Sequence, residues 1–246
     1  MRTPTAAELL NVWEHGLRQR PIDRALGLLR AVYPEQSTEI LADLSIGERD
    51  ARLLRVRELF FGPGITCTTC CPRCSERLEW ESDTADLFIH DGTTPTDELR
   101  VEADAYRLTF RLPTSRDLAA LDSGTNGGRD ERRQLLLERC LLEASTSEGE
   151  LLRITQLPNA ALQAMVQAID QADPQAHLLI SLTCPACSHC WEGLFDIVSF
   201  LWAEVNAWAE RTLRAVHLLA RAYGWREADI LAMSPTRRQI YLEMAG

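Results

Sequence analysis

Hydrophobic residues in the first sixty positions recur three or four residues apart, which is the spacing of one face of a helix. The earliest such set is Leu9, Leu10, Trp13 and Leu17. Thr5 and Ser45 each stand three residues before a glutamate, a capping-box pattern that predicts a helix start at both places. Pro21 can open a helix between them, and the run Gly62-Pro63-Gly64 stops the third. We therefore expect three helices in this part of the chain.

Farther along the chain the period of the pattern changes. Apolar and polar residues alternate in 99–105 and again in 106–112, which predicts two strands that pair in a small sheet. Helical spacing returns in 132–142 and 158–171, and a short helix is expected to follow residues 114–115. The polar or glycine-rich stretches between these segments are 83–97, 123–129 and 145–150. We expect the last two to be loops.

The last third of the chain is predicted to be mostly helical. A strand at 177–183 precedes an apolar stripe over 197–222, which allows one long helix or two helices with a break. Gly224 is expected to end that stretch. A short helix at 227–233 and a final helix that starts at Ser234-Pro235 complete the pattern.

Two turns of the form Cys-Pro-x-Cys carry the most specific chemistry. They are Cys71-Pro72-Arg73-Cys74 and Cys184-Pro185-Ala186-Cys187. Each turn offers two thiolates, which is half of a tetrahedral zinc site, and strand-like sequence follows at 76–80 and 191–195. Two such turns with their strands make a zinc ribbon. We predict one structural zinc ion per chain, bound by Cys71, Cys74, Cys184 and Cys187.

The remaining cysteines leave alternatives open. Cys67 and Cys70 form an overlapping C-x-x-C pair that could replace the first proline-containing pair as ligands. They lack the proline and the following strand, so we expect them to be bystanders. His189 and Cys190 lie just past the second turn, and His189 is a further possible ligand. Cys140 lies in a predicted helix and is expected in the core.

These patterns together predict an α+β protein. Helical N- and C-terminal segments flank a zinc ribbon with four cysteine ligands, and a small α/β insertion interrupts the ribbon. The predicted segments are 1–64 (N-terminal helices), 65–82 (first half of the ribbon), 83–176 (insertion), 177–196 (second half of the ribbon) and 197–246 (C-terminal helices).

Composition and charge limit the classes of function that the chain can have. The chain has 246 residues, 46% of them hydrophobic, so it is expected to be globular. It has no apolar run near the roughly 20 residues of a membrane span, and its start lacks the apolar stretch of a signal peptide. Paired C-x-x-C turns without a signal peptide favour metal binding in a reducing cytoplasm. No phosphate-binding glycine loop, G-x-S-x-G or H-E-x-x-H occurs, so no residues support an enzyme and we assign no catalytic residue.

Two other classes compete with a structural role. A nucleic-acid-binding zinc ribbon would use the same cysteines, but the formal net charge of −10 argues against affinity for a phosphate backbone. A thiol oxidoreductase needs a low-pKa thiolate at a helix N-terminus, whereas both turns lead into strand-like sequence.

The C-terminal region combines aromatic residues with arginines, as binding interfaces often do. The residues concerned are Tyr223, Trp225, Arg237, Arg238 and Tyr241. They can equally close a helical core with the arginines in solvent, so the sequence leaves both interpretations open.

The same tail resembles the end of baseplate proteins from T4-type contractile phage tails and related injection systems. The residues that carry the resemblance are 218–225, 227–231, 234–238 and 241–243, and two earlier stretches, 46–54 and 111–118, resemble the same relatives. Shorter versions of the tail resemble those of phage tail assembly chaperones. In such relatives the Cys-Pro pairs are the implied metal ligands, and Cys67 and Cys70 depart from the pattern.

The resemblance implies a non-enzymatic role in building a baseplate, as a minor structural component or as an assembly factor. The partners implied are baseplate or tail proteins. We expect the protein to be cytoplasmic, with incorporation into an assembled tail particle as the alternative.

Overall fold

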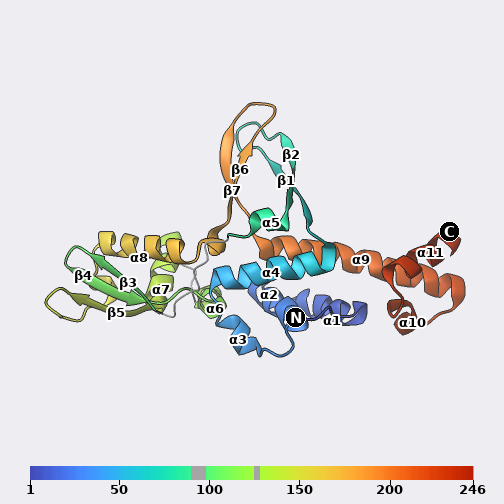
Figure 1. Ribbon diagram of the computed structural model, residues 1–246, viewed down its shortest axis with the longest axis horizontal. Helices are drawn as coiled ribbons and strands as arrows, with labels where there is room; N and C mark the ends of the chain where they lie inside the picture. Colours follow the sequence, from blue (N-terminus) through green and yellow to red (C-terminus); the bar gives the residue numbers. More distant parts are fainter. Residues whose placement is uncertain (90–97, 125–127, 246) are drawn as a thin grey trace. The chain divides into compact units, whose positions relative to one another are not determined.

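The structure is a computed structural model that describes residues 1–89, 98–124 and 128–245. The chain forms two compact units. One contains residues 1–38 and 196–246, and the other contains residues 39–195. The chain consists of helices and small antiparallel sheets, which Figure 1 shows as a ribbon. The predicted mixture of helix and sheet is confirmed.

The first unit begins with two capped helices. Helix α1 (Ala6–Gly16) has the predicted capping box, because Thr5 accepts from the Glu8 amide and Glu8 accepts from Thr5. Helix α2 (Pro21–Val32) starts with its proline, as predicted. Both helices contact α9 (Ile197–Tyr223).

Helix α9 is a single unbroken helix of 27 residues. Asp196 caps its start by accepting from the Val198 and Ser199 amides, and Gly224 ends it in the left-handed conformation (φ 69°). Short helix α10 (Glu227–Leu231) and α11 (Pro235–Ala245) follow and pack on α9. The sequence allowed a break within α9, and the structure excludes it.

Specific side-chain contacts join α1, α2 and α9. The Trp13 indole Nε1–H donates to Asn206 Oδ1 at 2.9 Å. The Arg24 guanidinium lies 4.6 Å from the ring centroid of Trp202, a cation–π contact. The indole N–H of Trp13 and the guanidinium of Arg24 therefore have their partners within the first unit.

The second unit begins within α3 (Thr38–Ala42), a helix not predicted from the sequence, and continues with α4 (Ile46–Phe61). Ser45 caps α4 by accepting from the Glu48 amide, and Gly62 (φ 83°) ends it. A second acceptor at this helix start was not predicted from the sequence. Asp173 Oδ2 accepts from the Gly47 amide at 2.8 Å. The start of α4 is thus bound to a residue 126 positions later.

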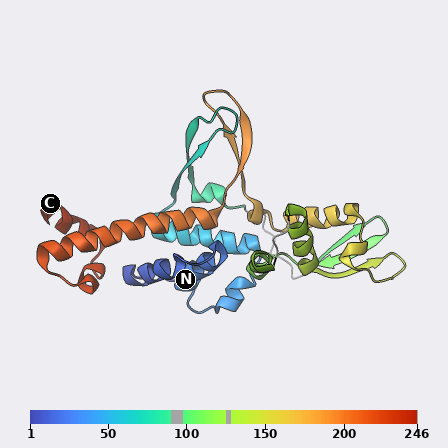
Figure 2. The ribbon, with the colours of Figure 1, turned by 180° about the vertical axis from the view of Figure 1, so that it is seen from behind.

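Two antiparallel hairpins hold the cysteine turns. The first pairs β1 (Gly64–Cys70) with β2 (Arg77–Asp83), and the second pairs β6 (Leu179–Thr183) with β7 (Cys190–Leu194). They lie side by side in both views of the ribbon (Figures 1 and 2). Strand β1 was not predicted as such. Its threonines and cysteines pair along the whole length of β2, so the partner strand fixes a segment whose own pattern is weak.

A short helix, α5 (Thr84–Leu87), follows the first hairpin inside the stretch predicted only to be polar. Asp83 and Asp86 form a capping box around it. Residues 88 and 89, which follow this helix, are the last described residues of this stretch. Residues 90–97, including His90, lie outside the described residues.

A three-stranded antiparallel sheet forms the rest of the insertion. Its order is β3 (Leu99–Ala103), β4 (Tyr106–Phe110) and β5 (Leu141–Thr146). The pairing of β3 with β4 confirms the prediction from alternation. Strand β5 was not predicted. Residues 145–150 were expected to be a loop, and the preceding helix was expected to reach residue 142. Helix α7 (Arg129–Cys140) ends at Cys140, and hydrogen bonds to β4 draw the next residues into the sheet.

The remaining elements of this unit are helical. They are α6 (Ser115–Gly124), η1 (Ile154–Gln156), α8 (Asn159–Ala172) and η2 (Pro174–His177). Leu108 and Phe110 of β4 pack with Met165 of α8 and with Cys140 of α7 in one buried cluster. Cys140 is fully buried there, as predicted, and burial raises the pKa of its thiol to about 11.

A buried ion pair explains the stretch 111–118. The side chain of Asp117 is 1% exposed and accepts from the Arg111 guanidinium at 2.6 and 2.9 Å and from Arg139 Nε at 3.0 Å. The Thr114 amide and hydroxyl also donate to it, each at 3.0 Å. Burial alone would raise the pKa of Asp117, but these donors outweigh it and lower the pKa to about 2.

Candidate metal centre and binding surfaces

The first cysteine turn is a tight loop closed by backbone hydrogen bonds. The Cys71 amide donates to the Glu76 carbonyl at 2.8 Å, and the Ser75 amide donates to the Cys71 carbonyl at 2.9 Å. Ser75 has a left-handed backbone (φ 62°), which is uncommon for a residue other than glycine. The strain is tolerated because the turn reverses the chain between β1 and β2 within a few residues.

The second turn repeats this geometry residue by residue. The Cys184 amide donates to the His189 carbonyl and the Ser188 amide to the Cys184 carbonyl, both at 2.9 Å. Ser188 is again left-handed (φ 55°). Two segments far apart in sequence therefore form the same loop, and each presents its two cysteines in the same way.

The two turns bring four sulfur atoms together. The Sγ atoms of Cys71 and Cys187 are 3.7 Å apart, and those of Cys74 and Cys184 are 3.6 Å apart. All four Sγ atoms lie within 4.8 Å of one another. The closest separations exceed the roughly 2.05 Å of a disulfide bond, and all eight cysteines are free.

The spacing of the sulfurs fits a tetrahedral metal ion. A zinc–sulfur distance of about 2.3 Å implies a sulfur–sulfur distance of about 3.8 Å in a regular tetrahedron. The observed distances of 3.6 and 3.7 Å are close to this value. The four cysteines could hold a metal ion of the kind that prefers thiolate ligands.

Burial around the cluster is uneven. Cys71 and Cys184 are 1% exposed and pack with Leu78, whereas Cys74 is exposed and Cys187 is half-buried. The half-buried Trp191 packs against the same cluster. One pair of thiols therefore faces an apolar interior, and the other pair closes the cluster on the solvent side.

Backbone amides point at three of the sulfurs, those of Cys71, Cys74 and Cys187. Burial alone would raise the pKa of Cys71, but the amides of Cys74 and Arg73 donate to its sulfur and lower the pKa to about 7. The His189 amide acts in the same direction on Cys187, yet burial and the neighbouring thiols raise that pKa to about 12. Four adjacent thiols thus cannot all ionise easily unless a cation compensates their charge.

The other predicted alternatives lie outside the sulfur cluster. Cys67 faces Trp80 across the first hairpin, and the exposed Cys70 faces Arg77 at its end. The His189 ring stacks on Trp191 with centroids 5.9 Å apart. Among the described residues, neither these two cysteines nor His189 joins the group that could hold a metal.

Three of the predicted partner-binding residues form one aromatic cluster. Tyr223 stacks on Trp225 with ring centroids 4.5 Å apart, and Tyr241 meets these two rings edge-on at 5.8 and 4.8 Å. Trp225 and Tyr241 also pack against the buried Leu219 and Ile230. The aromatics therefore close a small core and leave Tyr223 37% exposed.

The two predicted arginines are not equivalent. Arg237 is exposed, and its amide donates to the Ser234 hydroxyl that caps α11. Arg238 is 8% exposed and is the one buried residue of α11, a helix that lies entirely within the described residues. Its Nη1 is buried and has no hydrogen-bond partner within the described residues. The sequence could not separate these neighbours, because successive helical residues point in different directions.

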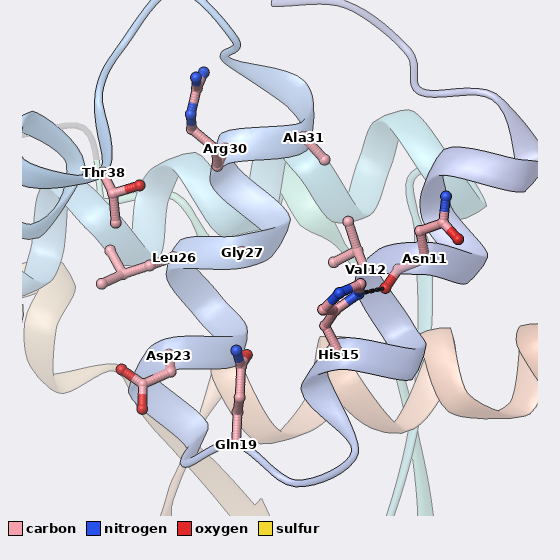
Figure 3. A pocket seen from close by; sticks show the side chains of 10 residues that line it. All are labelled: Asn11, Val12, His15, Gln19, Asp23, Leu26, Gly27, Arg30, Ala31 and Thr38. Atoms are coloured by element: carbon pink, nitrogen blue, oxygen red, sulfur yellow. Dashed lines mark hydrogen bonds between the residues drawn. The ribbon is translucent and has the colours of Figure 1, made fainter.

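A separate hollow of about 500 Å³ lies between α1 and α2 (Figure 3). Val12, Leu26 and Gly27 give it an apolar floor, with polar side chains around the rim. His15 Nδ1–H donates to the Asn11 carbonyl at 2.6 Å, the dashed line in Figure 3. Asp23 is paired with Arg20 at 2.9 Å. Each of these contacts is local to one helix, His15 with Asn11 in α1 and Asp23 with Arg20 at the start of α2, so the hollow has no evident chemistry.

Comparison with known protein families gives a match over most of the chain. A family model described as T4 bacteriophage base plate protein matches residues 25–202, which is well over half of the chain and includes both cysteine turns. The chain belongs to this family of T4-type baseplate proteins, so the resemblance seen in the sequence is confirmed.

Comparisons with curated proteins and with solved structures give no match. Each described helix is too short or too polar to cross a lipid bilayer. The family places the chain among the components of phage baseplates.

Proposed function

We propose that the protein is a non-enzymatic component or assembly factor of the baseplate of a contractile tail or related injection system, and that it acts by binding other tail proteins. The observation that carries the proposal is the family match over residues 25–202. The protein would act in the cytoplasm, where tails are built, with or without remaining in the finished particle.

Within this role, Cys71, Cys74, Cys184 and Cys187 bind one structural zinc ion and complete a zinc ribbon. Thiolate ligands and tetrahedral spacing favour zinc, and a site with four protein ligands has no open position for a substrate. The metal therefore joins two hairpins whose small sheets have little core of their own.

The charge of the hairpins supports protein binding over nucleic-acid binding. Residues 64–83 contain two arginines and four carboxylates, and residues 179–194 contain one carboxylate and neither lysine nor arginine. A nucleic-acid-binding ribbon needs basic groups at this place to contact phosphates.

Co-purification tests the proposed function. A tagged chain is expressed together with the tail genes that neighbour its own gene, and the bound proteins are identified by mass spectrometry. We expect tail or baseplate proteins in the eluate, and their absence would contradict the proposal. The control is the same tagged chain expressed without the tail genes.

Metal analysis tests the site separately. Elemental analysis of the purified chain is expected to give about one zinc per chain. Iron in the same four sulfurs would instead give a coloured protein, and no bound metal would overturn the ligand assignment.

A further inference from the structure

The C-terminal helix buries a positive charge that the described part of the chain does not neutralise. Arg238 is 8% exposed, and its Nη1 is buried without a hydrogen-bond partner among the described residues. No carboxylate of those residues forms an ion pair with it, and burial lowers the pKa of its guanidinium. A buried charge without a partner destabilises a fold, so its place in α11 needs a reason beyond packing.

The fold does not need an arginine at this position. Helix α11 contacts α9, and its Tyr241 and Leu242 pack in one apolar cluster with Leu219 of α9 and Ile230 of α10. A leucine or methionine at 238 would extend these contacts without the cost of removing a charge from water. Arginine differs from them by its planar fork of donors, which matches a carboxylate.

A groove of about 390 Å³ with a mixed polar and apolar lining runs between α9 and α11. Its lining residues are Leu218, Arg221, Ala222, Leu242 and Ala245. Arg238 lies four and seven residues before Leu242 and Ala245, which places the three on one face of the helix. Leu218 is 46% exposed, so part of the apolar lining is open to solvent.

The charge of this end is opposite to that of the chain as a whole. Residues 211–246 contain six arginines and three carboxylates, whereas the whole chain has a formal net charge of −10. An acidic partner would be attracted to this end and repelled by the remainder of the molecule.

We propose that the α9–α11 groove binds an apolar segment of a tail protein and that Arg238 pairs with an aspartate or glutamate side chain of that segment. The inference rests on the proposed function, because it takes the partner to be a tail protein. Arginine and aromatic residues are typical of the few residues that dominate an interface. The exposed Tyr223 and Leu218 then supply contact area around the ion pair.

Photo-crosslinking combined with two matched variants tests the inference. A photo-crosslinking amino acid is placed at position 218 of the tagged chain, which is co-expressed with the tail genes and irradiated. The crosslinked peptide is identified by mass spectrometry. We expect a tail-protein segment that contains an aspartate or glutamate.

Arg238→Met is expected to lower the crosslink yield at least about tenfold, as loss of a charged interface partner does. It should leave the melting temperature of the free chain unchanged or higher, because it removes an unpaired buried charge. The control Arg237→Met alters the exposed neighbour and should change both quantities little. Replacing the carboxylate of the captured segment by its amide should lower the yield as Arg238→Met does, with no further loss when the two changes are combined.

Several outcomes would overturn the inference. One is a crosslink yield that Arg238→Met leaves within twofold. Another is a lower melting temperature for Arg238→Met, which would assign the arginine to the fold. A crosslink to nucleic acid, or to a segment without a carboxylate, would also overturn the inference. If tail proteins co-purify normally but no crosslink forms at 218, this inference fails and the proposed function stands. If no tail protein co-purifies, both fail.

Discussion

At the scale of single residues, charge and sulfur chemistry decide what the sequence can predict. The four clustered cysteines could be selected from eight because each pair includes a proline and precedes a strand. Asp117 could not be selected, because its partner Arg139 lies 22 positions away and neither residue is unusual in its own segment. Whether an arginine is buried, as Arg238 is, depends on a helix face that the sequence leaves ambiguous.

Cys184→Ser is expected to weaken zinc binding by more than about 100-fold. Even a group in the second coordination shell contributes about 10–100-fold to metal affinity, and Cys184 is a direct ligand in the proposed site. Competition with a chromogenic chelator measures the affinity, and thermal unfolding reports the accompanying loss of stability. Cys70→Ser, next to the proposed ligand Cys71, is the control and should bind zinc normally. The opposite ranking of the two variants would show that the overlapping cysteine pair holds the metal.

Asp117 should make stability depend on pH in the acid range. Its pKa is about 2 in the folded chain, below the roughly 3.9 of a free aspartate. The stabilisation is therefore complete above about pH 4 and is lost as the pH falls toward 2. We expect roughly 1–2 kcal/mol, with allowance for solvent around the two arginines.

Urea unfolding between pH 2 and 6 measures this contribution. The free energy difference between the unmodified chain and Asp117→Asn should be largest near pH 6 and should shrink below pH 4. Asp122→Asn changes an exposed carboxylate of the same helix and serves as the control. A difference that does not depend on pH would contradict the assignment.

At the scale of elements, local signals predicted helix starts well and strands less well. Thr5, Pro21 and Ser45 all open helices where their patterns indicate, because a cap acts on amides within three residues. Strands β1 and β5 depend on partner strands instead. Strand β5 lies next to β4 only after two helices have returned the chain to the sheet, so its own residues give little sign of it.

The start of α4 gives a prediction at this scale. A Cβ at residue 47 would lie 1.9 Å from Asp173 Oδ1 and 2.9 Å from the Ala176 amide. Gly47→Ala should therefore separate α4 from η2 and destabilise the chain by about 2 kcal/mol or more, as a strained buried contact does.

The matched control for this variant is Gly27→Ala in α2. There the nearest atom, Val12 Cγ1, would lie 3.8 Å from the new Cβ, an ordinary contact. Gly27→Ala should stabilise the chain by about 0.5–1 kcal/mol, the usual gain for alanine in a helix. Chemical denaturation of both variants measures the contrast, and equal effects would refute the close approach of Asp173.

At the scale of the whole molecule, the sequence indicated the class of fold and the family but not the grouping of segments. The structure joins residues 1–38 with 196–246 in one unit. Helical periodicity marks which faces are apolar, but it does not say which helix covers each face. The five predicted segments remain a prediction about how the chain is divided.

Removing the proposed zinc ion should destabilise the whole second unit. Two-stranded sheets are marginal by themselves, and the zinc binding free energy of such sites is part of the folding free energy. We expect a strong chelator to lower the melting temperature by about 5 °C or more, and added zinc to restore it. Cys184→Ser should show no response to the chelator. An unchanged melting temperature in a chain shown to have lost its zinc would contradict this account.

The two matching cysteine turns also impose an order on synthesis. A ribosome that has made Cys74 must add 110 further residues before Cys184 exists, which takes roughly 5–20 s at common elongation rates. Throughout this interval the nascent chain has only one of the two loops, so its thiols face the cytoplasm and its oxidants without the partner that encloses them. Closure of the proposed site is therefore a late event, and the supply of zinc at that moment competes directly with thiol oxidation.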